Sequence, residues 1–565
     1  MQKRRSQTCA TMKFLVKLSL LVAMSAGALT ASAQEYKFGG MMMDHDGMMS
    51  SDFFSLSQVN FGFGTARSMA MAGAFTSLGA DASSMGINPA GLGMYRHNEI
   101  SFSPIINATR TENSANATNW GQNEQSRFAM SNFAAVIKLQ ESASGGLVSA
   151  NFAIGMNRIA DFNYRMGYTS TSAPSVSPYR SINDAFIRQM GQGGVFPNSQ
   201  GILNYNYADS YFWGGALAFN NYLIDAYTDE YGDYWTSADR LGANAGIGHT
   251  VEEQSRGSIN EFDFAFGFNF NNNLYVGATF GIQSVRWKRQ LYYAEDYLYN
   301  GQTPVYSDGT PLAEPAEWMD YNQAVNLKGV GVNLKLGMVY RPIESIRLGL
   351  AIHTPTEYLL ERSYQAYMAS NFNPNGDTTR PLEDAGENAW EFYSPTRLML
   401  GGSYTLGRWA IFSVDYERTW YNGMRVTNIP GGFDISKDAY RTEITENYKG
   451  SNTLRAGIEV KPLPILSLRV GYGVAGSALR NAKDLYYNSP TVYKTDCMSA
   501  GAGVQLGRVS LDVAYQYLKY HRTEYLLYYA LHTPRGGQSY FDTASPIYKS
   551  DLSRNLLVMT MGIKF

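Results

Sequence analysis

The sequence predicts an all-β protein, a transmembrane antiparallel β-barrel of about fourteen strands. Three observations lead to this prediction: the composition, an alternation of apolar and polar residues, and an alternation of short and long connections. Aromatic residues make up 14% of the 565 residues, including 41 Tyr, and there are 55 Gly but only 17% charged residues. Such a composition suits strands that contact lipid on one face and water on the other. The net charge of −2 gives no indication of binding to nucleic acid or to an anionic membrane surface.

The alternation has a period of two residues from about residue 97 onward. It is clearest over residues 262–270, where every second residue is Phe and the residues between are small or polar. The same period recurs over 332–340, 454–460, 466–472 and 511–517. Charged residues on the polar faces, such as Arg455 and Glu459, would be costly in a dry core but are tolerated in a water-filled lumen.

The connections between the predicted strands alternate in length. We predict strands at 97–109, 126–139, 147–165, 258–270, 273–292, 326–342, 344–365, 392–406, 408–426, 450–462, 464–478, 495–506, 508–530 and 554–565. Short turns, for example at Asn271-Asn272 and Gly507, alternate with long connections such as 166–257. Short turns at one end and long loops at the other are typical of outer-membrane barrels. The last strand ends on Phe565, which resembles the recognition signal of the barrel-assembly machinery.

Residues 1–33 have the pattern of a secretory signal peptide. Lys13 and Lys17 supply positive charge, an apolar run follows, and Ala31-Ser32-Ala33 is a small-residue cleavage site. Its removal leaves Cys497 as the one cysteine, so we expect no disulfide within the mature chain. No other apolar run approaches twenty residues, so we expect no transmembrane helix. An exported chain of this strand pattern is expected in the bacterial outer membrane.

Residues 34–96 lack the alternation, and the barrel is expected to occupy residues 97–565. The stretch 61–93 is crowded with Gly, Ala and Ser, and predicts a helix over Ala66–Leu78 and a turn capped by Asp81. A barrel of about fourteen strands has a lumen too wide to be filled by its own side chains. We therefore expect this segment to plug the lumen.

At this segment the chain resembles a known family. The stretch from Gly62 to Leu92, with Asp81 and Asn88-Pro89-Ala90, looks like the N-terminal hatch of FadL/TodX-type transporters, which are outer-membrane channels for long-chain fatty acids and other hydrophobic compounds. The resemblance implies a luminal hatch that includes Gly73, Asn88, Pro89 and Ala90. It also implies capture of ligand by outer loops, a pocket near the hatch, and lateral release at a kinked strand. The family includes proteins described as hemin receptors, so the ligand stays open.

The long loop over 166–257 is unusually apolar for a loop. We expect short helices at Ile182–Met190 and Tyr211–Ala226. A hydrophobic capture site facing outward is expected to use Phe212, Trp213, Leu217, Phe219 and Leu223. The alternative is that these side chains pack the loop onto the mouth of the barrel.

Two residues of the third strand are candidates for the lateral gate. Gly155 and Asn157 interrupt an otherwise regular alternation, and Gly inside a strand often marks a bulge or bend. The alternative is a Gly-Asn pair that faces the lumen without any gap.

The candidate ligand contacts in the lumen are His353 and Arg347. His353 is expected to face the lumen if Ile352 faces lipid, and could contact a carboxylate or haem iron, or be a solvated residue. Arg347, Arg455 and Arg469 could bind a carboxylate headgroup, but pairing with Glu459 or Asp512 is the preferred expectation.

Metal binding and enzyme activity have weaker support in the sequence. The Met-rich run from Met41 to Met49, with His45, could bind copper or haem iron, but we expect a terminal segment without a metal. No GxSxG, HExxH or P-loop motif occurs, so we expect no enzyme and no cofactor.

The sequence therefore predicts a passive channel for hydrophobic small molecules such as long-chain fatty acids, with loop capture, a lumen pocket and a gating hatch. The expected partners are that ligand, outer-membrane lipid and, during biogenesis, the barrel-assembly machinery; a monomer is expected. The alternatives are a haem-binding receptor and a porin whose plug is merely structural.

Overall fold

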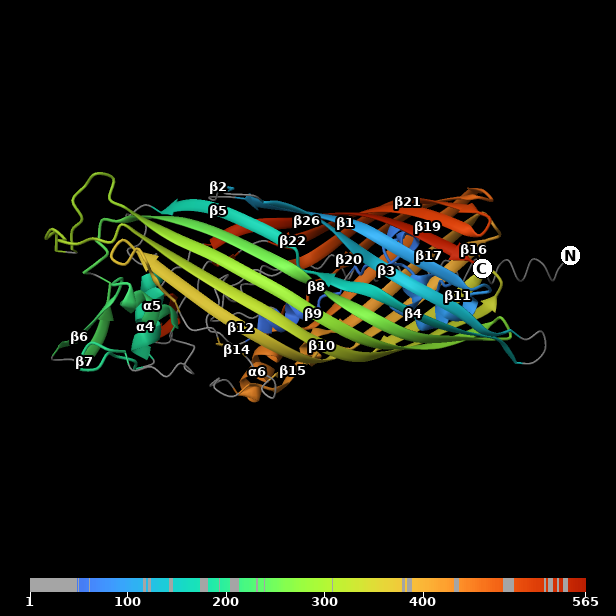
Figure 1. Cartoon of the computed structure of the whole chain (residues 1–565), viewed down its shortest axis with the longest axis horizontal. Coiled ribbons are helices and arrows are strands. Elements are labelled where there is room, and N and C mark those ends of the chain that lie inside the picture. Colours follow the sequence, from blue (N-terminus) through green and yellow to red (C-terminus); the bar gives the residue numbers. More distant parts are fainter. Residues whose placement is uncertain are drawn as a thin grey trace. The chain divides into compact units, whose positions relative to one another are not determined.

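Figure 1 shows the computed structural model of the chain. The structure describes residues 48–565 except for 49, 60, 115–117, 120–122, 142–145, 173–180, 193, 204–212, 230–231, 238, 307, 379–381, 384–388, 431–435, 481–491, 523–524, 527–531, 536–537 and 542–546. The predicted signal peptide 1–33, the run Met41–Gly47 and Phe212 lie outside the described residues.

The wall is a closed antiparallel barrel with fourteen strand positions. In order around the ring these are β1 (Glu99–Ser114), β3 (Glu124–Glu141), β4 (Leu147–Asp161) continued by β5 (Tyr164–Ser172), β8 (Gly246–Phe270), β9 (Leu274–Leu298), β10 (Trp318–Ile343), β11 (Ile346–His353) continued by β12 (Glu357–Ser370), β15 (Trp390–Tyr393) with β16 (Arg397–Leu406), β17 (Ala410–Trp420) with β18 (Arg425–Asn428), β19 (Gly450–Leu463), β20 (Leu466–Ala475), β21 (Val492–Leu506), β22 (Val509–Arg522) and β26 (Ile547–Lys564). β26 pairs with β1 and closes the ring. The predicted fold class is confirmed.

The alternation seen in the sequence separates the two faces of this wall. Phe262 and Phe264 are 51% and 38% exposed on the outer face, whereas Asp263 between them is fully buried in the interior. On β11, Ile352 faces outward and His353 inward, as the sequence predicted. An apolar outer face and a polar interior are the pattern of a barrel that crosses a membrane.

Four strands that the sequence predicted as continuous are interrupted. The third is broken after Asp161, the seventh after His353, the eighth after Tyr393 and the ninth after Trp420. Pro355 and Pro395 lie in the second and third of these breaks, and proline has no N–H to contribute to a strand ladder.

The connections sort by length as predicted. At one end, Asn271 and Asn272 have the positive φ values of a tight turn, 51° and 56°. The loops at the other end carry α4 (Ile182–Gln192), α5 (Trp213–Asn220) and α6 (Lys437–Asn447), and the short strands β2 (Thr118–Asn119), β6 (Asp225–Asp229), β7 (Gly232–Thr236), β13 (Asp377–Thr378), β14 (Leu382–Glu383), β23 (Tyr525–Leu526), β24 (His532–Arg535) and β25 (Gln538–Phe541). In the part of the chain that the structure describes, no helix is long and apolar enough to cross a membrane.

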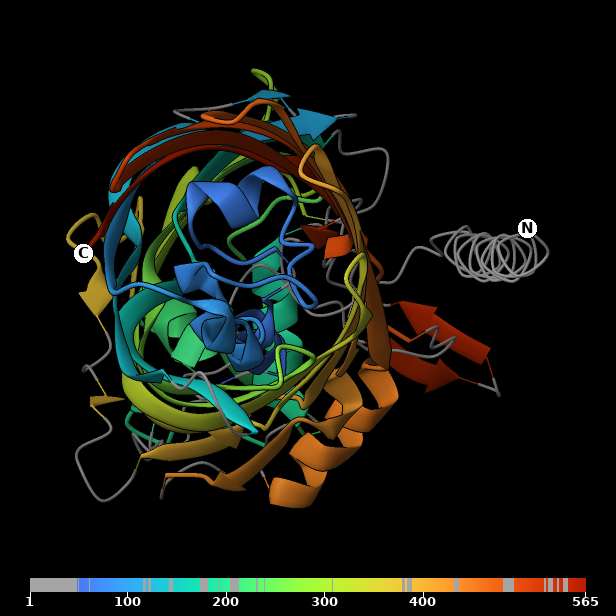
Figure 2. The ribbon, with the colours of Figure 1, turned by 90° about the vertical axis from the view of Figure 1, so that its right-hand side faces the viewer.

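The described part of the chain before β1 lies inside the ring of strands (Figure 2). It contains α2 (Ser50–Ser57), α3 (Ala66–Ala70), and the 3₁₀ turns η1 (Ala82–Met85), η2 (Pro89–Met94); a further turn, η6 (Tyr421–Gly423), lies between β17 and β18. We call residues 61–95 the luminal segment. The predicted helix over Ala66–Leu78 is shorter than expected, because Ala72 and Gly73 adopt positive φ values of 53° and 74°.

Candidate functional site

The luminal segment rests directly on the backbone of the strands at positions where the wall has glycine. A Cβ atom on Gly277 would lie 2.4 Å from Pro89, and one on Gly337 would lie 1.9 Å from Oδ1 of Asn88. Other inward-facing glycines that contact the segment are Gly155, Gly267, Gly349, Gly401, Gly457, Gly471 and Gly501. Their lack of side chains is what lets two backbones approach closely here.

Asn88 connects the luminal segment to two strands. Its Nδ2 donates to the carbonyl oxygens of Thr76 (2.6 Å), Met338 (3.3 Å) and Leu350 (3.3 Å). Its Oδ1 accepts from the N–H of Ala90 and caps η2, in which Pro89 is the first residue. The structure thus brings together three of the predicted hatch residues. Gly73 lies apart from them, 3.6 Å from Cδ of Arg455 when given a Cβ.

Further hydrogen bonds hold the segment to other sides of the ring. The N–H of Thr76 donates to Asp415 Oδ2 on β17 at 2.7 Å, and the N–H of Ala66 donates to Thr560 Oγ1 on β26 at 2.7 Å. Asp81 accepts from the N–H of Ser83, which confirms the predicted cap. The polar partners on the strands were not predicted, since a buried Asp or Thr on a lumen face has no sequence signal that separates it from a solvated one.

A cavity of about 100 Å³ lies between α2 and the luminal segment. Apolar side chains from the chain before β1, among them Leu56, Phe63 and Ile87, form part of its lining. Tyr358 and Met399 contribute from the wall. The cavity also reaches Asn157, Arg158 and Ile159 near the end of β4.

The charged residues of this cavity pair with one another. Glu417 accepts hydrogen bonds from Arg397 and Arg455, each at 2.7 Å. Lys335 contacts Glu261 and lies 3.1 Å from Asp263. Paired and hydrogen-bonded charges can remain in a confined interior, whereas single ones cannot.

The backbone pairing between β3 and β4 stops part-way along the wall, and we call this unpaired stretch the gap. β3 pairs with β4 from Glu141 as far as Asn132, which lies opposite Asn157. From Ser131 to Glu124, β3 pairs only with β1 among the described strands. Beyond this gap the wall closes again, where Asn123 exchanges hydrogen bonds with the backbone of Gly167 at 2.7 and 3.2 Å.

The gap arises because the end of β4 bends into the lumen. A register shift falls between Arg158 and Ala160. The carbonyl of Asp161 accepts a hydrogen bond of 2.7 Å from Arg554, which comes from β26 on the far side of β1 and β3. Phe162 then packs against Trp287 inside the barrel, with ring centroids 5.1 Å apart.

Arg158 spans this gap. Its Nη1 lies 2.6 Å from Asp161 Oδ2, its Nε is 3.4 Å from the carbonyl of Met130 on β3, and its guanidinium lies over the ring of Phe63. The sequence gives no signal for Arg158, because the period-two alternation that turns Asn157 inward places the next residue on the outer face.

The two predicted gate residues lie on the closed side of the gap. Asn157 forms its border, because Asn132 Nδ2 donates to Asn157 Oδ1 and Asn157 Nδ2 donates to Asp263 Oδ2, both at 2.6 Å. Gly155 is within the regular ladder, opposite Ala134, and the bulge falls beyond it. Gly155 instead provides space for Met85 of η1. Their role in a gate stays a prediction.

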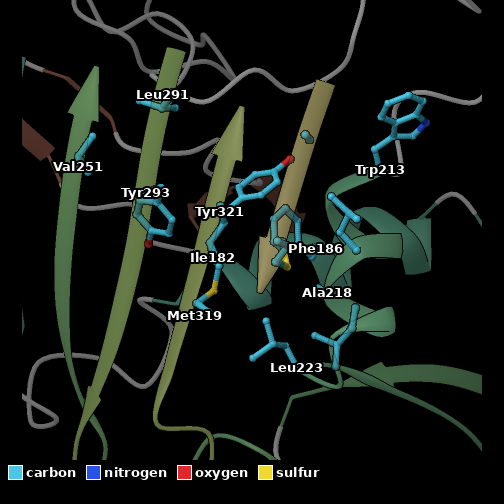
Figure 3. Packing of buried hydrophobic residues seen from close by; sticks show 14 of the residues in the cluster. Ile182, Phe186, Trp213, Ala218, Leu223, Val251, Leu291, Tyr293, Met319 and Tyr321 are labelled. Carbon is cyan, nitrogen blue, oxygen red and sulfur yellow. The ribbon is translucent and has the colours of Figure 1, made fainter. Parts of the chain in front are cut away.

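The apolar residues of the long loop are packed inward. Trp213, Leu217 and Leu223 are all at most 2% exposed and belong to one cluster with the inner faces of β8, β9, β10 and β12. Figure 3 shows α4 and α5 beside these strands, with Phe186 close to Tyr321 at a centroid separation of 5.8 Å. In this conformation these three side chains pack the loop onto the barrel mouth, as the alternative expects, and their role in ligand capture stays a prediction. Phe219 is half-buried against the same cluster.

His353 and Arg347, the two candidate ligand contacts in the lumen, line different cavities. His353 lines the cavity, and its Nε2 is 3.0 Å from the carbonyl oxygen of Ile87, so it holds the luminal segment. Arg347 faces a separate, larger hollow on the short-turn side of the segment. The preferred pairing is found for Arg469, which lies 2.7 Å from Glu459 and 2.5 Å from Asp512. Among the described residues, no group of three His, Cys, Asp or Glu side chains could hold a metal ion.

No family model and no curated protein matches the chain. Among solved structures, it is similar to a FadL homologue from Pseudomonas aeruginosa, with 12% identity over 89% of this chain and 100% of that chain and a TM-score of 0.49. It is also similar to the Pseudomonas putida toluene transporter TodX, with 12% identity over 90% and 99% of the two chains and a TM-score of 0.47. A third similar structure is the Ralstonia pickettii toluene transporter TbuX, with 15% identity over 90% of this chain and 99% of that chain and a TM-score of 0.46.

At these identities the likeness concerns the fold alone. The three structures are of the FadL/TodX type that the sequence resembled around Gly62–Leu92. None of the three is described as a haem receptor, so that part of the expectation gains no support.

Proposed function

We propose that this protein is an outer-membrane channel through which hydrophobic small molecules enter by diffusion. The observation that carries the proposal is the gap in the wall between β3 and β4, at the place where the luminal cavity meets Asn157, Arg158 and Ile159. A plugged barrel that only stabilises a membrane needs no such interruption in the strand pairing of its wall.

The proposed route runs from the loop end to the cavity and then sideways. Ligand leaves the loop end past α2, rests against Leu56, Phe63 and Ile87, and passes between β3 and the bent end of β4. Phe128, 75% exposed on the outer face beside the gap, offers an apolar surface continuous with the bilayer. Removing apolar surface from water supplies about 0.8 kcal/mol per CH₂ group, so capture needs no specific chemistry.

The size of the cavity points to small ligands. About 100 Å³ is of the order of the engineered apolar cavity of about 150 Å³ that binds benzene. A long-chain fatty acid enters only if α2 or the luminal segment moves, which is the gating role we propose for Asn88, Pro89 and Ala90. A haem receptor is disfavoured because Nε2 of His353 already contacts the Ile87 carbonyl.

The test is transport into liposomes that contain the purified protein. We expect faster entry of toluene and octanoate than into empty liposomes, and no acceleration for sucrose. Equal acceleration of sucrose would identify an open porin instead. Ala129→Trp, which places a bulky ring on the inner side of the free edge of β3, should slow toluene entry, whereas Phe128→Trp on the outer face should not. Unchanged entry in Ala129→Trp would show that the ligand does not leave through this gap.

A further inference from the structure

The outer face of the wall carries a group of cations on three neighbouring strands. Arg256 of β8 lies directly opposite Lys288 of β9, and Arg286 of β9 lies opposite Lys328 of β10. All four are exposed. We call these four residues the basic cluster.

The basic cluster is poorly compensated by acids. Lys328 Nζ lies 2.8 Å from Glu361 Oε2 on β12. In the described part of the chain, no ion pair is formed by Arg256, Arg286 or Lys288. Like charges directly opposite each other destabilise a sheet, so this arrangement favours an anion bound between the strands.

The height of the cluster can be derived from the apolar residues below it. On β10, Val330 and Tyr340 are the first and last exposed apolar residues of an alternating run that ends at the short turn. Ten residues at about 3.4 Å each, tilted by about 40°, cover about 25 Å along the membrane normal, which is the usual height of the apolar band. Lys328 therefore lies at the level of the outer-leaflet headgroups.

A polar groove continues outward from the cluster on the same strands. It measures about 500 Å³. Gln254 and Gln290 lie one rung above Arg256 and Lys288, and Tyr292 and Asn322 lie one rung higher. Side-chain amides and hydroxyls of this kind can donate to and accept from sugar hydroxyls.

Apolar strands, cations and a polar groove follow one another from the membrane outward. We propose that the outer face of β8, β9 and β10 binds one phosphorylated glycolipid of the lipopolysaccharide type, with its acyl chains on the apolar band, its phosphates on the basic cluster and its sugars in the groove. Phosphate binds cationic side chains through charge-assisted hydrogen bonds. The proposal rests on the location in the outer membrane and not on which solute the channel carries.

The test compares Arg286→Gln/Lys288→Gln with wild type and with the matched double variant Lys494→Gln/Lys519→Gln. The control removes two outer-face lysines on β21 and β22, each of which is paired with an Asp. Binding of purified lipopolysaccharide to the detergent-solubilised protein is measured by native mass spectrometry. At about 1 kcal/mol per cation near a charged surface, we expect roughly ten- to thirty-fold weaker binding in the cluster variant and wild-type binding in the control.

Two further probes identify the ligand. Lipopolysaccharide from which the phosphates have been removed should bind the wild type about as weakly as intact lipopolysaccharide binds the cluster variant. Equal binding of both forms, or full retention by the cluster variant, would overturn the proposal. If inorganic phosphate raises the unfolding temperature of wild type as much as lipopolysaccharide does, the site takes a free anion and the lipid assignment is wrong. Toluene entry, measured with the same variants, should stay at the wild-type rate, so failure here is distinct from failure of the channel proposal.

Discussion

Asn132 and Asn157 form the last rung of the ladder between β3 and β4, joined by a side-chain hydrogen bond of 2.6 Å from Nδ2 of Asn132 to Oδ1 of Asn157. Both side chains are buried. Asn157 is tied on its other side to Asp263, so this rung fixes the place where the gap begins.

Replacing Asn157 with Leu should destabilise the barrel and lengthen the gap. The change leaves the amide of Asn132 and the carboxylate of Asp263 without their Asn157 partner, at a cost of about 1–3 kcal/mol. We expect a lower unfolding temperature and faster toluene entry. Asn260→Leu, on the outer face of β8, is the control and should change neither. A lower unfolding temperature with unaltered toluene entry would show that the Asn132–Asn157 bond stabilises the barrel but does not control passage through the gap.

Replacing Gly337 with Val should displace the luminal segment. The new Cβ would lie 1.9 Å from Oδ1 of Asn88, so the bonds from Asn88 to β10 and β11 cannot persist. We expect a higher steady conductance in planar bilayers. Gly402→Val is the control, because a Cβ there has nothing within 4 Å. A closed Gly337→Val channel would contradict a hatch held at Asn88.

Leu217→Ala should loosen the long loop from the barrel mouth. Leu217 is 2% exposed, and a buried Leu→Ala change costs about 2–5 kcal/mol locally. We expect faster proteolysis between β5 and β8, with Ile202→Ala, an exposed residue of the same loop, as the control. If proteolysis is unchanged but toluene entry at low concentration falls, Leu217 contacts ligand instead of packing the loop.

Glu417→Gln should remove the carboxylate that Arg397 and Arg455 share beside the cavity. Removing one partner of a buried pair costs about 3–5 kcal/mol. We therefore expect a lower unfolding temperature and a gain in affinity for octanoate over octanol, measured by calorimetry. Asp551→Asn, which breaks the half-exposed pair with Lys519, should lower the unfolding temperature little. No gain for octanoate would mean that ligand does not reach these guanidinium groups.

The contact between α2 and α6 should weaken as pH rises. Burial raises the pKa of Glu443 on α6, and the hydrogen bond of 2.5 Å from Ser50 Oγ to Glu443 Oε1 offsets this only in part. A carboxyl group with a raised pKa stabilises the contact below its ordinary pKa, and that stability is lost as pH increases through the raised value. A spin label at Ser55 should become more mobile over this range, and the change should vanish in Glu443→Gln. Equal pH dependence in both proteins would exclude Glu443 as the cause.

Much of the barrel could be predicted from the sequence because one side of each strand faces apolar surroundings. Where the outer face is polar the signal fades, so the predicted start of β8 was residue 258 and the observed start is Gly246. The inward bend of β4 at Asp161 depends on Arg554, nearly four hundred residues away, and no local pattern reveals it. By contrast, Pro355 and Pro395 were visible in the sequence and mark two of the four strand breaks.

The hydrogen bond from Ala66 N–H to Thr560 joins the luminal segment to β26, the strand whose pairing with β1 closes the ring. That bond can form only after β26 is in place. The segment precedes every strand of the wall in the chain, yet one of its contacts is with the last strand in the chain. Two routes of assembly are therefore open to the luminal segment. It stays inside the incomplete ring until β26 pairs with β1, or it enters the closed barrel through one end.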